Sequence, residues 1–180
     1  MFHCKSERCN LNTTGLQIQR KIAGTISPND NVIFDTLLNS KGSVFYDSLT
    51  GQIVINKNGM YFINWSVSTQ SSLGSNNLIF SIQSSNGDDL IGNSSINTGE
   101  VIGFDIIQVD SAPIALSLIN KTSNDIVYST LVPIVANLVL FETPECTVNT
   151  SASGATGITG STGITGATWI TGITEATLML

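Results

Sequence analysis

The chain has 180 residues, which leaves room for one domain of ordinary size with terminal extensions. It is 41% hydrophobic but only 11% charged, whereas soluble proteins are typically about 25% charged. The net charge of −6 and the absence of any basic run disfavour nucleic-acid binding. Ser, Thr and Asn must cover much of the surface. Such a surface suits a subunit that packs against copies of itself, because burying an amide costs less than burying a charge.

Residues 1–15 are polar and are expected to form an N-terminal arm. The arm contains Cys4 and Cys9, and the third cysteine, Cys146, follows the last expected strand. An odd number of cysteines at the chain ends predicts disulfides between subunits. Reduced thiols are the main alternative, and zinc is a weaker one because no second ligand pair has finger spacing. The arm lacks the apolar core of a conventional signal peptide, and no segment of the chain reaches the length of a membrane span.

Residues 16–142 are expected to form an all-β domain, an antiparallel jelly-roll sandwich, since short apolar runs alternate with turn clusters. Strict alternation in residues 61–68 predicts a strand that buries Tyr61, Ile63, Trp65 and Val67. Phe80 and Phe104 also fit core patterns. The other apolar runs lie at residues 16–22, 32–34, 44–46, 52–56, 78–83, 101–109, 113–119 and 126–141, and residues 39–42 read as a connection.

A linker at residues 143–153 leads to a tail, residues 154–180, that divides into eight triplets ending in Thr as far as residue 177. Six of these triplets begin with Gly, and Trp169 and Glu175 interrupt the pattern. Glycine at every third position is what a collagen triple helix requires, because only glycine fits at its axis. The tail lacks proline, so a flexible linker and an extended strand docked on a neighbour are alternatives. The candidate residues for a triple helix or for docking are Gly154, Gly157, Gly160, Gly163, Gly166, Trp169 and Gly172.

A jelly roll beside Gly-x-Thr triplets resembles the bacterial spore-surface proteins of the exosporium and spore appendages, which have TNF-like heads of the complement-globular-head type. Residues 51–68 are similar to the head signature, in which a strand and a glycine turn lead into the next strand. Residues 126–141 resemble the last core strand of such heads, and residues 111–113 resemble the entry to the strand before it. In this chain the repeat follows the head instead of preceding it.

This resemblance implies a homotrimer in which both chain ends emerge at one face, bringing the cysteines near one another. It also implies assembly at the spore surface, extracellular once the mother cell lyses, without a conventional signal peptide. Other spore-surface proteins are then possible partners. O-glycans are expected on tail threonines, with Thr156, Thr159, Thr162 and Thr165 as candidates.

No catalytic, cofactor or metal residues emerge from the sequence, and we do not expect an enzyme. The single histidine, His3, lies in the arm, and the carboxylates show no paired spacing for acid–base chemistry. Asp88 and Asp89 follow a turn and are interpreted as a solvated hairpin, with calcium binding as the alternative. The leading hypothesis is a structural, self-assembling subunit of a spore-surface layer or fibre. The alternative is a trimeric adhesin or lectin-like head on a short stalk, which a groove lined by aromatic residues would favour.

Overall fold

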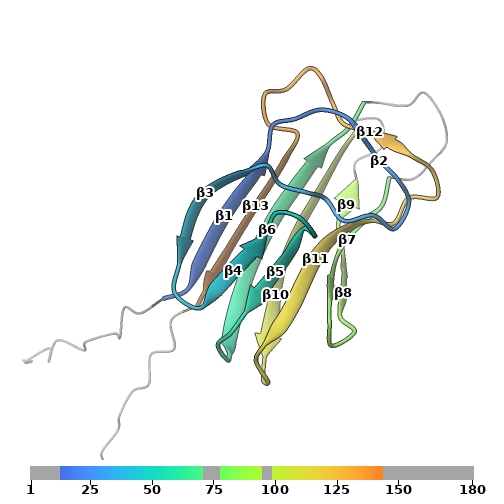
Figure 1. The fold of residues 1–180 in the computed structure, drawn as a ribbon. Coiled ribbons are helices and arrows are strands. Elements are labelled where there is room, and N and C mark those ends of the chain that lie inside the picture. Colours follow the sequence, from blue (N-terminus) through green and yellow to red (C-terminus); the bar gives the residue numbers. More distant parts are fainter. Residues whose placement is uncertain (1–12, 71–77, 95–98, 144–180) are drawn as a thin grey trace, which may run out of the picture. The chain divides into compact units, whose positions relative to one another are not determined.

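The computed structural model describes residues 13–70, 78–94 and 99–143, and these residues form a two-layered β sandwich (Figure 1). The strands are β1 Gly15–Arg20, β2 Thr25–Ile26, β3 Thr36–Lys41, β4 Val44–Asp47, β5 Gln52–Ile55, β6 Gly59–Ser68, β7 Phe80–Ser84, β8 Asp89–Ile91, β9 Asn93–Ser94, β10 Glu100–Val109, β11 Ile114–Asn120, β12 Ile126–Val127 and β13 Ala136–Glu142. In the described part of the chain, no helix is long and apolar enough to cross a membrane.

One sheet has the strand order β3-β1-β13-β6-β10-β9, and the other has the order β4-β5-β11-β7-β8. A short pair, β2 with β12, closes one end of the sandwich. Every strand pairing is antiparallel. Chain neighbours such as β5 and β6 lie in different sheets, which is the arrangement of a jelly roll. The predicted all-β, antiparallel jelly-roll sandwich is therefore confirmed for the described residues.

The inward faces of the two sheets form one apolar core. The alternation predicted for β6 is confirmed, since Tyr61, Ile63, Trp65 and Val67 are all at most 1% exposed. Phe80 on the opposite sheet is also fully buried. The Tyr61 hydroxyl still satisfies its hydrogen bond by donating to the carbonyl oxygen of Lys57 at 2.9 Å. Aromatic side chains thus fill the space between the layers without leaving this polar atom unpaired.

Two sequence-based assignments are wrong. Residues 39–41 belong to strand β3 and do not form a connection; β3 is an exposed edge strand, so its polar composition conceals it. Residues 126–141 do not form one strand, because β12 ends at Val127 and β13 begins only at Ala136. The apolar run at residues 32–34 buries Val32 and Phe34 outside any named strand.

The first and last strands of the domain lie side by side and bring the two chain ends together. Gly15 of β1 is paired with Phe141 of β13. Beyond this pair, the amide of Glu142 donates to the carbonyl oxygen of Thr14 at 2.8 Å, and the amide of Thr14 donates to the Glu142 carboxylate at 3.0 Å. The described chain therefore begins and ends at the same end of the domain (Figure 1).

Candidate subunit interface

The six-stranded sheet has an outward face that is apolar along β10, β6 and β13. Inward and outward residues alternate along each strand, and the strand register aligns the outward ones in rows across the sheet. One row joins Ile106, Phe62 and Phe141 and continues to Gly15 and Lys41. The outward apolar residues of these three strands are Met60, Phe62, Ile102, Phe104, Ile106, Val139 and Phe141.

Three phenylalanines form the centre of this apolar face. The ring of Phe62 lies 4.8 Å from that of Phe104 in an edge-on arrangement and 4.8 Å from that of Phe141 at a tilt of 37°. Phe104 is nevertheless 66% exposed, and Phe141 is 43% exposed. An exposed, contiguous cluster of aromatic side chains on a soluble domain marks a contact surface. We call the seven outward residues of β6, β10 and β13 the aromatic face.

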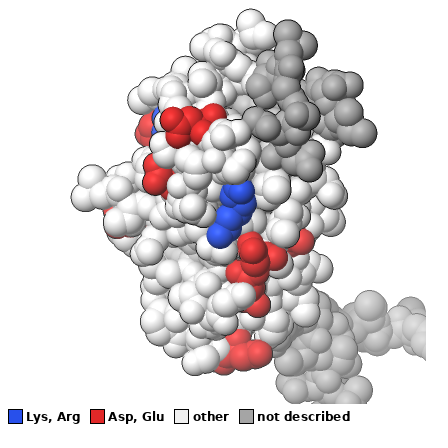
Figure 2. All heavy atoms as spheres, turned by 90° about the vertical axis from the view of Figure 1, so that its right-hand side faces the viewer, with Lys and Arg blue, Asp and Glu red and all other residues white. Residues whose placement is uncertain are grey.

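Towards β1 and β3 the same outward surface becomes polar but stays almost uncharged. Its side chains there are mainly amides, and the Gln19 amide donates to the Asn137 side-chain oxygen at 3.3 Å. The outward amide residues are Gln17, Gln19, Asn39, Asn64 and Asn137. On the side of the molecule drawn in Figure 2, charged groups likewise occur in small separate clusters on a largely uncharged surface. A partner can therefore cover these surfaces with little cost of desolvating charge.

The aromatic face adjoins an open strand edge. Strand β9 pairs with β10 only at Val101 and Ile102, so the described residues leave the edge from Gly103 to Val109 unpaired. Asp105 lies on this edge, on the inward side of β10, and is only partly exposed. Burial raises the pKa of the Asp105 carboxyl above its usual value. An inward-pointing carboxylate on an open edge hinders uncontrolled pairing with other strands.

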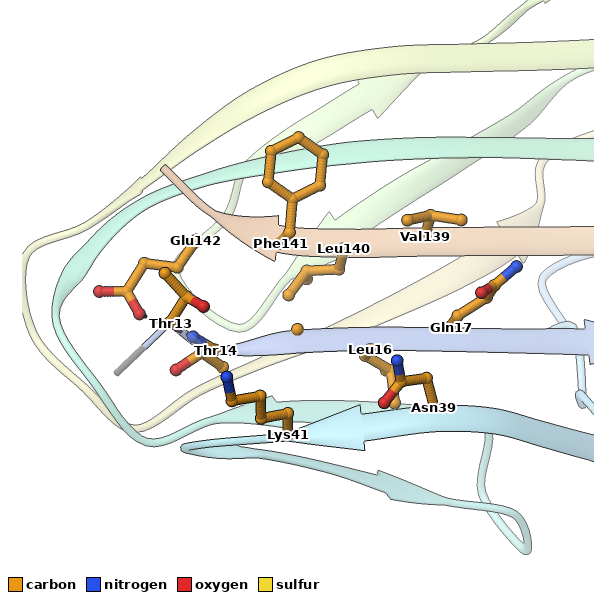
Figure 3. Close-up of a pocket in the computed structure, with 11 residues that line it drawn as sticks. Thr13, Thr14, Leu16, Gln17, Asn39, Lys41, Val139, Leu140, Phe141 and Glu142 are labelled. Atoms are coloured by element: carbon orange, nitrogen blue, oxygen red, sulfur yellow. Dashed lines mark hydrogen bonds between the residues drawn. The ribbon is translucent and has the colours of Figure 1, made fainter. Parts of the chain in front are cut away.

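A hollow of about 400 Å³ lies at the β1 end of the same sheet. Its floor is at Gly15, which has no side chain, and Phe141 and Lys41 stand on either side of it in the strand register. Figure 3 shows the side chains of β1, β3 and β13 around it, with Thr13, Thr14 and Glu142 at its outer rim. The hollow thus opens where both chain ends leave the domain.

Glu142 holds this end of the domain together. The Lys57 ammonium group lies 2.6 Å from one of its carboxylate oxygens, and the Thr14 amide donates to the other. Burial opposes ionisation of Glu142, but these hydrogen bonds outweigh it and lower the pKa of the carboxyl below its usual value. The ion pair therefore joins the end of β13 to the turn before β6, and the hydrogen bond from Thr14 joins it to the residue that precedes β1.

Phe104 is the clearest correction to the sequence analysis. The sequence pattern predicts a core position for Phe104, and this prediction is wrong. Strand β10 directs Val101, Gly103 and Ile107 inward and Phe104 outward. Both sides of β10 carry apolar residues, so hydrophobicity alone does not identify the buried side. The aromatic face is therefore not predicted from the sequence. The one signal for it in β10 is that small Gly103 lies on one side of the strand and the bulky Ile102, Phe104 and Ile106 lie on the other.

Most predicted site residues lie outside the described residues. These are His3 and the disulfide candidates Cys4, Cys9 and Cys146; the tail candidates Gly154, Gly157, Gly160, Gly163, Gly166, Trp169 and Gly172; and the glycosylation candidates Thr156, Thr159, Thr162 and Thr165. Within the described ranges, no group of three or more His, Cys, Asp or Glu side chains is arranged to hold a metal ion. Asp88 accepts a hydrogen bond from the Ser84 hydroxyl at 2.7 Å, within the expected hairpin turn.

Comparison with solved structures identifies the class of fold. Murine APRIL superposes with a TM-score of 0.51 at 10% identity, covering 73% of this chain and 99% of that one. The globular domain of zebrafish complement 1qA protein (TM-score 0.48, 14% identity, 72% and 94% covered) and the PRD1 vertex protein P5 (0.46, 17%, 72% and 95%) also match. The match to APRIL at this identity shows the fold alone, an antiparallel jelly-roll sandwich. No protein-family model and no curated protein sequence matches the chain.

Proposed function

We propose that this chain is a structural, self-assembling subunit of a bacterial spore-surface layer or fibre, and that its jelly-roll head forms a homotrimer. The aromatic face carries the proposal. An exposed cluster of Phe62, Phe104 and Phe141 on an almost uncharged sheet needs a covering partner, and a second copy of the chain supplies equally uncharged surfaces.

A threefold assembly is the arrangement that the resemblance to TNF-like heads implies. In a ring of three, each subunit contributes two different surfaces. We assign one of them to the aromatic face and the other to the open β10 edge beside it, from Gly103 to Val109. The arm and the tail leave the head together, next to Thr14 and Glu142, so both are available to join one trimer to the next.

The spore-surface location rests on the Gly-x-Thr triplets beside a jelly-roll head. In this proposal the protein reaches the surface by assembly in the mother cell and has no enzymatic activity. The alternative adhesin would be favoured by a groove lined with aromatic residues, and the hollow at Gly15 has a single aromatic residue, Phe141. Immunogold labelling of sporulating cells tests the location: label in the vegetative cytoplasm alone would refute it.

Light scattering at micromolar concentration tests the trimer. The full chain should have a mass of three times 19.1 kDa or a multiple of that value. Phe104→Asn should shift the protein to monomers, because it places an amide at the centre of the aromatic face. Phe45→Asn is the matched control, since Phe45 is similarly exposed, at 60% against 66%, but lies on the other sheet. A wild-type monomer, or equal effects of the two substitutions, would refute the proposed interface.

A further inference from the structure

Strand β3 leaves the far edge of the six-stranded sheet open. It pairs with β1 on one side only, and among the described residues no other strand pairs with it. Two consecutive leucines on it are exposed, Leu37 by 57% and Leu38 by 49%. The register with β1 shifts between Gln17 and Ile18, which places Leu38 at a bulge. An open edge with exposed leucines is a surface to which an extended segment can add as a further strand.

The hollow at Gly15 adjoins this edge. Asn39 and Lys41 of β3 form one wall of it, and Phe141 of β13 lies on the other side (Figure 3). Alanine would fit at residue 15, because the nearest atom to an added Cβ is the Leu140 carbonyl oxygen at 3.7 Å. Packing does not require the glycine, which leaves space there for a side chain from another segment.

The tail has the composition and the spacing of such a segment. Its threonines and isoleucines are β-branched and favour extended structure. Ile158, Ile164 and Ile170 are six residues apart. Because six is a multiple of the two-residue period of a strand, an extended tail directs all three isoleucines to one side.

The linker is long enough to carry the tail to this edge. The described chain ends beside the hollow at Thr143, and β3 is two strands away from β13, about 10 Å across the sheet. Residues 144–153 span as much as about 33 Å when extended. The linker therefore covers the distance to β3 of its own head, and it also suffices for the β3 edge of a neighbouring copy that lies within about 33 Å of Thr143.

We infer that residues 154–177 of one copy dock as an additional strand on β3 of a neighbouring copy, with Ile158, Ile164 and Ile170 on one side of the added strand. This inference rests on the proposed self-assembly and specifies the joint between trimers. The tail then acts as an intermolecular connector, and the β3 edge is its receptor.

Hydrogen exchange and light scattering on the full chain test this joint. In wild-type assemblies, the amides of Thr36–Lys41 should exchange at least about tenfold more slowly than in a variant carrying Ile158→Ser, Ile164→Ser and Ile170→Ser. The variant should retain trimers but lose the larger species. Unchanged exchange of the β3 amides in this variant would overturn the inference.

Substitutions on the receptor side provide the matched control. The double variant Leu37→Lys, Leu38→Lys should also stop at trimers, because it places two charges on the edge. Leu49→Lys combined with Leu131→Lys should assemble as the wild type does, since these leucines are 90% and 92% exposed and lie outside β3, in the β4–β5 and β12–β13 connections. Loss of assembly in both double variants would contradict a specific β3 joint.

Dilution distinguishes a neighbour's tail from the chain's own tail. Protection of β3 that disappears when larger species dissociate to trimers supports docking between copies, whereas protection that persists in isolated trimers overturns it. Monomers in every variant, wild type included, would instead refute the proposed trimer. The proposed trimer is therefore tested by the mass of the wild type, and the proposed docking of the tail by the exchange of the β3 amides.

Discussion

Trp65 and Gly103 are paired across β6 and β10, and the indole of Trp65 occupies the space where a side chain at residue 103 would stand. A Cβ added at Gly103 would overlap indole atoms Cε2, Nε1 and Cζ2. Gly92, next to β8, is close to the same ring, where an added Cβ would overlap Cη2. The largest core side chain thus lies against two positions that have no side chain, and this packing fixes which side of β10 faces inward.

Gly103→Ala should therefore destabilise the domain by about 1–3 kcal/mol, because the indole and the strand must move apart. Denaturant unfolding followed by Trp fluorescence measures the loss. Gly15→Ala is the matched control, since Gly15 also lies in a strand but an added Cβ there has ordinary contacts. Equal unfolding midpoints for the two variants would contradict the packing described for Trp65.

Asp105 should make the fold less stable at neutral pH than at acid pH. Burial raises the pKa of its carboxyl, so the folded state binds the proton more readily than the unfolded state. This contribution to stability is present below the unfolded-state pKa and is lost as pH rises through the raised pKa. Asp105→Asn should thus exceed the wild type in stability at neutral pH, and the difference should narrow in acid. A stability difference between Asp105→Asn and the wild type that does not change with pH would contradict a raised pKa of Asp105 in the folded state.

The contribution of Glu142 to the stability of the fold should have the opposite pH dependence. Its pKa is lowered, so its contribution is present at neutral pH and is lost as pH falls through the lowered value. Glu142→Gln should be less stable than the wild type at neutral pH, and the two proteins should converge in acid. Denaturation midpoints across the same pH series as for Asp105→Asn provide the measurement. Parallel curves for wild type and Glu142→Gln would mean that Lys57 and Thr14 do not stabilise the ionised carboxylate.

The cysteines should cross-link subunits in mature assemblies. Cys9 precedes Thr14 by five residues and Cys146 follows Glu142 by four, and Thr14 and Glu142 are hydrogen-bonded to each other. The two cysteine-bearing segments therefore begin side by side. Non-reducing gels should show multimers that collapse with a reductant, and replacing Cys4, Cys9 and Cys146 by serine should abolish them. Identical mobility with and without reductant would exclude disulfides between subunits.

The sequence was sufficient to predict the fold class and the strongest strand, because strict alternation in β6 leaves only one side that can be buried. It was insufficient where both sides of a strand are apolar, as in β10. The sequence pattern there predicts burial equally for Val101, which is buried, and for Phe104, which is exposed. It also failed where a strand is mostly polar, as in β3, whose exposed edge position removes the apolar signal. The aromatic face depends on the pairing of β10, β6 and β13, and strands so far apart in the chain share no local pattern.

Because β1 pairs with β13, the two ends of the head differ. The described chain begins and ends at one end of the domain, whereas the loop between β12 and β13, with Leu131 almost fully exposed, lies at the other (Figure 1). If subunits are anchored through their chain ends, every copy presents this loop in the same direction. The two surfaces of a layer built in this way would differ. A peptide inserted at Leu131 would be displayed only on the surface that faces away from the anchored chain ends.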